Sequence, residues 1–129
     1  MHKLTLPLLC LLILATSCAV PKWMNGSWEG TGNQIDGKTW KVEMVSEAGV
    51  GTEVSYPGLN CGGIWDLRDT RILTMEFQEE IEYGTEFCDQ HVRVVVKKLM
   101  GNRIHVKYYL PGIEGPIAEA ILVKVEELG

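Results

Sequence analysis

Glu79 is the residue of this sequence whose type and spacing most suggest chemistry. It continues the alternate positions of Met75, Phe77 and Ile81, which on one strand would turn toward the core. A carboxylate on an apolar face is unfavourable unless it gains a hydrogen-bonding partner or a proton. We therefore expect Glu79 to point inward and to be paired, with Arg93 or a tyrosine as its partner.

Three interpretations of Glu79 follow from this placement. It could be a buried polar anchor that fixes strand register, a carboxylate that faces a ligand in a pocket, or a residue that a β-bulge exposes to water. Aromatic residues share the expected inner faces, and they could line a cavity, although core packing is the favoured role. They are Trp40, Tyr56, Trp65 and Tyr83. With Glu79 they form the candidate set for ligand binding or internal support.

Other acidic residues cluster between Glu76 and Asp89, but their spacing matches no known site. No twelve-residue calcium loop is present, and alternate Glu residues on a strand usually form a solvated face. Beyond the N-terminal segment the histidines are His91 and His105, which we expect to point outward, and no serine has the context of a nucleophile elbow. We therefore expect no catalytic residue, no metal and no cofactor.

The N-terminal segment has the layout of a secretory signal. Lys3 precedes an apolar run over residues 4–15, which is shorter than the roughly 20 residues needed to span a bilayer, and small residues lead into Cys18. This arrangement resembles a bacterial lipoprotein signal. The resemblance implies that residues 1–17 are removed and that Cys18 carries the lipid. Ala19, rather than Asp, after the acceptor implies the periplasmic face of the outer membrane in a Gram-negative host.

Four cysteines divide between this segment and the domain that follows. Cys10 lies in the apolar run and Cys18 is the expected lipid acceptor, which leaves Cys61 and Cys88. In an exported, oxidising compartment such a pair is expected to form a disulfide. Two distant cysteines with no second pair at ligand spacing do not make a zinc site.

The charge of the chain excludes some partners. It contains 17 acidic and 12 basic residues, for a net charge of -5, and Lys97 and Lys98 are its only adjacent basic pair. Phosphate binding requires clustered Lys or Arg, so neither nucleic acid nor anionic lipid is an expected partner. Membrane association should come from the lipid at Cys18.

Period-two alternation dominates the rest of the chain, and no window has a sustained helical stripe. Turn residues such as Asp36-Gly37 and Pro111-Gly112 separate the alternating runs. We count about eight strands, within residues 27–34, 40–44, 53–56, 63–68, 73–83, 91–97, 104–108 and 117–125, the last of them apolar on both faces.

Short connections favour an antiparallel meander. Eight such strands can close into a small barrel, and a β-sandwich is the second choice. We expect a signal peptide over residues 1–17, a lipid-anchored tether over 18–25 and a single β domain over 26–129.

Two motifs resemble known β proteins. Gly26-Ser27-Trp28 is similar to the Gly-x-Trp that opens lipocalin- and avidin-type barrels. The segment from Tyr56 to Gly63 resembles a Tyr-Pro-x-Leu-x-Cys-Gly-Gly motif of small exported bacterial β domains of uncharacterised function. The second resemblance implies a β fold and a disulfide, and it brings no activity with it.

Taken together, these patterns favour a lipid-anchored, non-catalytic binding or interaction module of the cell envelope. Its partner would be a small molecule or a protein. An alternative is an inhibitor or immunity protein against a cell-wall-degrading enzyme such as lysozyme, toward which an acidic surface would steer. A carboxylate hydrolase is a third class, and it would require Glu79 to open onto a cleft beside a second carboxylate.

Overall fold

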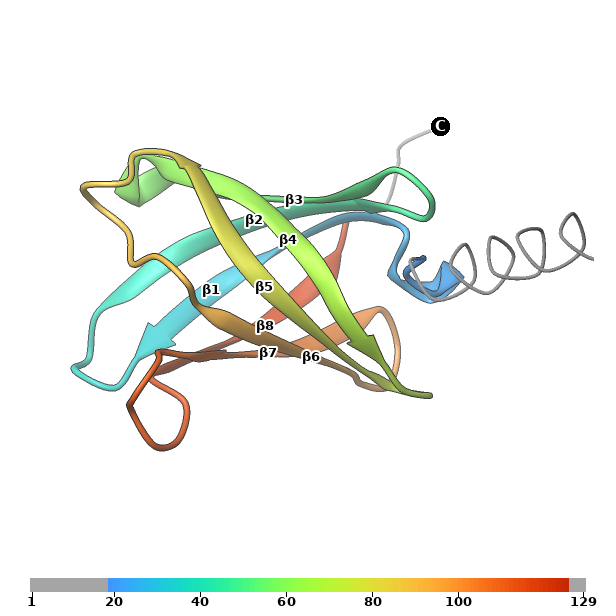
Figure 1. The fold of residues 1–129 in the computed structure, drawn as a ribbon. Coiled ribbons are helices and arrows are strands. Elements are labelled where there is room, and N and C mark those ends of the chain that lie inside the picture. The colour runs from blue at the N-terminus through green and yellow to red at the C-terminus, as the bar shows by residue number, and fades with distance from the viewer. Residues whose placement is uncertain (1–18, 126–129) are drawn as a thin grey trace, which may run out of the picture.

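A computed structural model describes residues 19–125, which form one closed β-barrel (Figure 1). Each strand pairs antiparallel with the next, and β8 returns to pair with β1. This confirms the barrel and rejects the sandwich. The elements are the 3₁₀ helices η1 (Lys22–Met24) and η2 (Pro57–Leu59) and the strands β1 (Gly26–Gln34), β2 (Thr39–Glu47), β3 (Gly51–Tyr56), β4 (Cys61–Thr70), β5 (Thr74–Tyr83), β6 (Arg93–Lys98), β7 (Arg103–Tyr109) and β8 (Ala118–Lys124).

Alternation of side chains builds the core of the barrel. On β8, Ala118, Ala120 and Leu122 are buried, whereas Ile121 and Val123 are exposed. The apolar character of both faces of this strand therefore does not mean that both faces are buried. Apolar side chains from every strand fill the interior, as expected for a barrel of eight strands.

A β-bulge near the end of β5 changes which residues face inward. Ile81 pairs with Gly63 and Tyr83 pairs with Gly62, so β5 has one extra residue between these pairs. Beyond the bulge the alternation slips, and Tyr83 is 54% exposed. The prediction that Tyr83 lies on the inner face was wrong for this reason. Glu79 precedes the bulge and keeps its inward direction.

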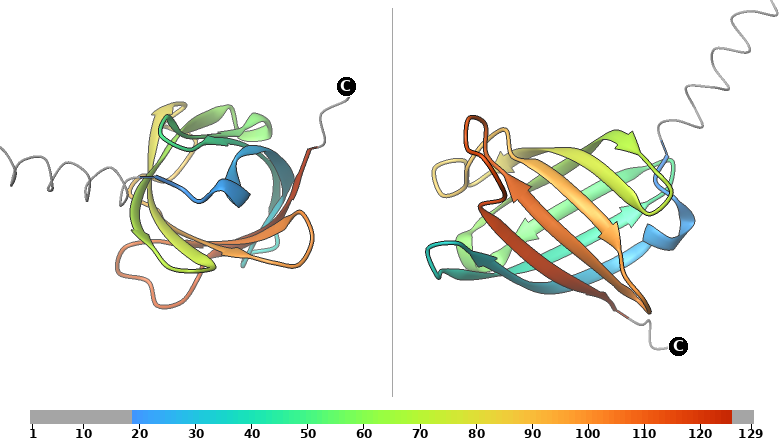
Figure 2. Two further views of the ribbon diagram at one scale, coloured as in Figure 1. Left: turned by 90° about the vertical axis from the view of Figure 1, so that its right-hand side faces the viewer. Right: turned by 90° about the horizontal axis from the view of Figure 1, so that it is seen from below.

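One end of the barrel, which we call the η1 end, is covered by the chain that enters β1. Figure 2 shows η1 lying across this opening. Met24 is fully buried there, and its carbonyl accepts a hydrogen bond of 2.9 Å from Nε1 of Trp28. Val20 is also buried. The predicted tether over residues 18–25 therefore includes part of the packed domain, while Cys18 itself lies outside the described residues.

The opposite end, which we call the pocket end, contains four connections, at residues 35–38, 57–60, 84–92 and 110–117. The predicted disulfide between Cys61 and Cys88 is present, with a Cα–Cα distance of 6.4 Å. It fastens the long connection after β5 to the start of β4. No helix within residues 19–125 is long and apolar enough to cross a membrane.

Candidate functional site: a carboxyl group in the barrel interior

Glu79 lies inside the barrel, as the alternation of β5 predicts, and is 4% exposed. Its Oε2 atom accepts hydrogen bonds from the hydroxyl of Tyr56 and from Nε1 of Trp65, the latter at 2.8 Å. A tyrosine is therefore a partner, as expected. Arg93 is not, because it lies on the outside of the barrel and pairs with Glu76 at 2.9 Å. The predicted alternative in which a bulge exposes Glu79 is also rejected.

Burial sets the acidity of this cluster. Loss of hydration raises the pKa of Glu79 above its ordinary value, the hydrogen bonds from Tyr56 and Trp65 offset only part of that rise, and the charge of Asp89 adds to it. Burial likewise raises the pKa of Tyr56, with further contributions from Tyr108 and Glu79. The pKa of Tyr108 is raised mainly by burial and then by Glu79. Both tyrosines therefore stay neutral, and Glu79 gives up its proton less readily than an exposed glutamate.

Aromatic rings surround the carboxyl group. The ring of Trp40 meets Tyr56 and Tyr108 edge-on, with centroids 5.3 and 5.2 Å apart. The ring of Trp65 packs against Phe77, with centroids 5.6 Å apart. The Trp65–Phe77 pair is tilted, whereas the two Trp40 pairs are edge-to-face, an arrangement that adds to simple apolar contact. The prediction that Trp40, Tyr56 and Trp65 lie on inner faces is thus confirmed.

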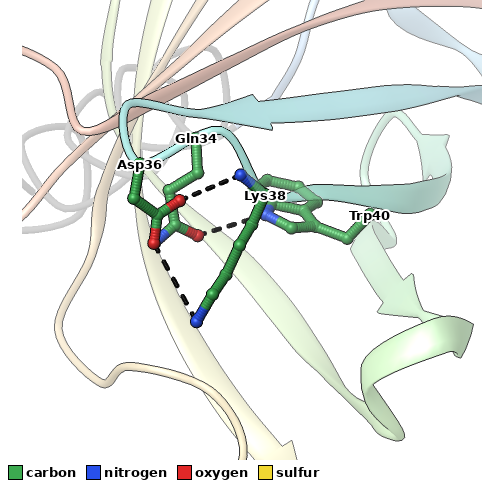
Figure 3. A network of polar contacts seen from close by, with 4 residues as sticks. All are labelled: Gln34, Asp36, Lys38 and Trp40. Carbon is green, nitrogen blue, oxygen red and sulfur yellow. Dashed lines mark hydrogen bonds and ion pairs between the residues drawn. The ribbon is translucent and has the colours of Figure 1, made fainter.

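The hairpin between β1 and β2 holds Trp40 in place (Figure 3). Nε1 of Trp40 donates to Oε1 of Gln34, and Nε2 of Gln34 donates to Oδ2 of Asp36, both at 3.3 Å. The ring also covers Gly32, where an added Cβ would meet it at 2.2 Å. Trp40 therefore has a defined position, although it is only partly buried.

A pocket of about 100 Å³ lies beside Glu79 at the pocket end. Its buried wall includes Glu79, Tyr56 and Tyr108, and its rim includes the exposed Phe87 and Asp89 from the connection after β5. Among the described residues that line it, Glu79 and Asp89 are acidic and none is Lys, Arg or His. The pocket is therefore lined by aromatic rings and two carboxyl groups.

Three polar residues that line the pocket were not among the sequence candidates. Tyr108 could have been found, because it shares the inner parity of Ile104 and Val106 and has a hydroxyl group that needs a partner. Gln34 could also have been found, because it ends β1 on the inner parity of Trp28 and Gly32. Asp89 lies in a connection, where alternation does not apply, and its position follows from the disulfide at Cys88.

The size of the pocket limits its chemistry. A cavity that holds benzene has a volume of about 150 Å³, so a sugar ring does not fit beside Glu79. A second carboxylate, Asp89, does line the pocket, but Oε2 of Glu79 is occupied by two hydrogen bonds. No group of three or more His, Cys, Asp or Glu residues within residues 19–125 could hold a metal ion. The pocket therefore has room for a small group beside Glu79 and Asp89.

We compared the chain with protein-family models, with curated proteins and with solved structures, and none of them matched.

Proposed function

We propose that this protein is a non-catalytic binding module of the cell envelope whose pocket accepts a small ammonium group carried by its ligand. The observation that carries the proposal is the composition of the pocket, in which two carboxyl groups and several aromatic rings lie with no basic residue among the described lining. Aromatic walls with nearby negative charge recognise organic cations.

Glu79 has one oxygen available for such a group. Both of its hydrogen bonds use Oε2, and Oε1 has no hydrogen-bonding partner among the described residues. An ammonium group beside Oε1 would stabilise the ionised carboxylate and offset the cost of its burial. The rings of Trp40, Tyr56 and Tyr108 would add cation–π attraction.

The volume of about 100 Å³ admits an ammonium group with a few carbon atoms. A larger ligand would place only its charged end beside Glu79, and the remainder would lie over the rim formed by the connections of the pocket end. The natural ligand would then be an amine-bearing molecule whose other contacts are with these connections.

The envelope location in this proposal comes from the sequence, in which residues 1–17 resemble a lipoprotein signal and Cys18 would be acylated. The fold supports such an anchor, because Ala19 and Val20 lie beside Gly49 and Val50 at the η1 end. Figure 2 shows η1 across the same opening. A domain held from that end would present the pocket away from the membrane.

Calorimetric titration with ethylammonium chloride tests the proposed ligand class. A ligand of three heavy atoms has at best about -1.5 kcal/mol per atom, so we expect a dissociation constant in the millimolar range. Propionate and 1-propanol are slightly larger and carry no positive charge, and neither should bind. Glu79→Gln should abolish binding of ethylammonium, while Glu80→Gln on the outer face of the same strand should not. Equal binding of 1-propanol, or binding that survives in Glu79→Gln, would refute the proposal.

An inhibitor of a cell-wall-degrading enzyme is the second candidate, and the rim of the pocket favours it. The connections of this end carry Asp36, Glu86 and Glu114 beside the exposed apolar side chains of Phe87 and Ile113. An acidic rim with apolar tips is complementary to a basic enzyme such as lysozyme. Full lysozyme activity at micromolar excess of the protein would remove this candidate, whereas inhibition that Phe87→Ser weakens would support it.

A further inference from the structure

We propose that the η1 end of the barrel rests on a lipid bilayer and that its connections insert apolar tips among the headgroups. This inference extends the membrane anchoring in the proposed function, and it adds a second contact that the lipid alone does not provide. The occupant of this surface is the membrane to which the chain is attached.

Every connection at the η1 end carries an exposed apolar side chain. They are Val50 between β2 and β3, Ile72 and Leu73 between β4 and β5, and Met100 between β6 and β7. Their side chains are between 50% and 90% exposed. Large apolar residues at successive loop tips on one side of a domain are costly in water, and they mark an interaction surface.

The path of the chain identifies the partner of this surface. Ala19 is the first described residue and leads into η1, which lies across the same opening as these connections (Figures 1 and 2). The apolar run over residues 4–15 and Cys18 precede it directly. A bilayer that holds a lipid on Cys18 would therefore lie next to the apolar tips.

The charge of the connections has the sign that a bilayer with anionic lipids requires. The entry segment and the three connections of the η1 end, over residues 19–25, 48–50, 71–73 and 99–102, contain Lys22 and Arg71 and no acidic residue. Glu126 and Glu127 follow β8 in the sequence. The adjoining strand ends carry charges of both signs. Basic residues near a membrane surface are attracted to anionic headgroups.

The pocket end differs in this respect. Its four connections contain Lys38 and the acidic residues Asp36, Glu86, Asp89 and Glu114. Exposed apolar tips occur there too, but an acidic surface is repelled by anionic headgroups. The connections of the two ends thus differ in charge, and those of the η1 end are the better match to anionic headgroups.

Site-specific fluorescence on the acylated chain, which begins at Cys18, tests this orientation. Met100→Cys and Ile35→Cys place a label at opposite ends of the barrel, at side chains that are 85% and 77% exposed. Each variant is labelled with an environment-sensitive nitrobenzoxadiazole dye and reconstituted in vesicles of phosphatidylethanolamine and phosphatidylglycerol. We expect nitroxide lipids to quench the dye at position 100 about threefold or more strongly than the dye at position 35.

Flotation of the unlabelled chain with the same vesicles separates the two proposals. If the chain floats and both dyes are quenched equally, or only position 35 is quenched, the orientation inferred here is overturned and the membrane anchor stands. If the chain does not float, both the membrane anchor and the proposed contact of the η1 end with the bilayer are refuted. Ile72→Cys provides a second label at the η1 end and should behave like Met100→Cys.

Discussion

Glu79 is buried and accepts two hydrogen bonds on a single oxygen. Its environment should therefore be visible in the pH dependence of the free energy of unfolding. The folded protein raises the pKa of this carboxyl above its ordinary value of 4.5. Above pH 4.5 the unfolded chain therefore releases its proton while the folded chain still holds it. Linkage then requires the free energy of unfolding to fall as the pH rises toward the folded pKa.

Glu79→Gln removes that titration but keeps an oxygen that can accept the same hydrogen bonds. We predict that the free energy of unfolding of the wild type decreases relative to that of Glu79→Gln as the pH rises from 4.5. The decrease is at most about 1.4 kcal/mol per pH unit. Guanidinium unfolding, followed by tryptophan fluorescence at several pH values, measures this. A constant difference between the two proteins across the range would contradict the raised pKa.

Tyr56→Phe tests the hydrogen bonds themselves. Loss of the hydroxyl leaves Glu79 with Trp65 as its remaining hydrogen-bond donor in the buried cluster, and we expect destabilisation of about 1–3 kcal/mol. Tyr109→Phe is a matched control, because the ring of Tyr109 packs beneath Arg93 and its hydroxyl has no hydrogen-bonding partner in the described part of the chain. It should change stability by less than about 0.5 kcal/mol. Equal effects of the two substitutions would show that the cluster around Glu79 is not specifically stabilising.

At this scale the sequence predicted much of the site. Parity alone placed Glu79, Trp40 and Trp65 inside, because side chains on an uninterrupted strand alternate strictly. The prediction that Tyr83 faces inward was wrong because the bulge adds a residue before it, and no residue type in this segment indicates a bulge. Parity argues against Arg93, which alternates with the buried Val92 and Val94. Which tyrosine reaches Glu79 could not be chosen from sequence, because that depends on the register in which the barrel closes.

Among the elements, the pair β4–β5 depends on a glycine. A Cβ on Gly63 would lie 1.8 Å from the carbonyl oxygen of Glu80, beside the bulge that turns Tyr83 outward. This contact is with backbone, so relief requires the strands to separate. Only glycine is compatible with the observed pairing at this position.

We predict that Gly63→Ala destabilises the barrel by about 2 kcal/mol or more. Gly58→Ala is the control, because an added Cβ there has nothing within 4 Å and the backbone does not have a positive φ. Thermal unfolding, monitored by circular dichroism, compares the two variants. Similar midpoints would mean that the bulge adapts easily and that the pairing described here is not a strong constraint.

The disulfide links an element to the site. Cys61 and Cys88 are 27 residues apart, and closing such a loop stabilises a folded protein by about 3.5 kcal/mol through the entropy of the unfolded chain. We expect the double variant Cys61→Ala/Cys88→Ala to lose about that amount. It should also bind ethylammonium more weakly, because Asp89 and Phe87 belong to the connection that the disulfide holds. Unchanged affinity in a folded double variant would show that this connection is not part of the site.

The sequence was sufficient to predict the strands and favoured a barrel, but it was not sufficient to establish that the strands close. Alternating runs and turn residues predict eight strands, but the pairing of β8 with β1 depends on register across the whole sheet. The covering role of η1 was missed, since three residues after Pro21 have no helical periodicity and only the burial of Met24 reveals their packing.

The whole molecule has two unlike ends. The η1 end combines chain entry, apolar tips and basic connections, and the pocket end combines the disulfide, an acidic rim and the interior carboxyl group. This polarity joins the two proposals, because a barrel that rests on the membrane at one end presents its pocket to the surrounding compartment at the other.

The acidity of Glu79 in the presence of a bound cation tests the central claim most directly. Carbon-13 NMR of the glutamate carboxyl groups, assigned with Glu79→Gln, follows the protonation of Glu79 with pH. In the free protein the pKa of Glu79 should lie above 4.5, and saturating ethylammonium should lower it, since the cation favours the ionised form. A pKa of Glu79 that is the same with and without ethylammonium would contradict a cation-binding pocket in this barrel.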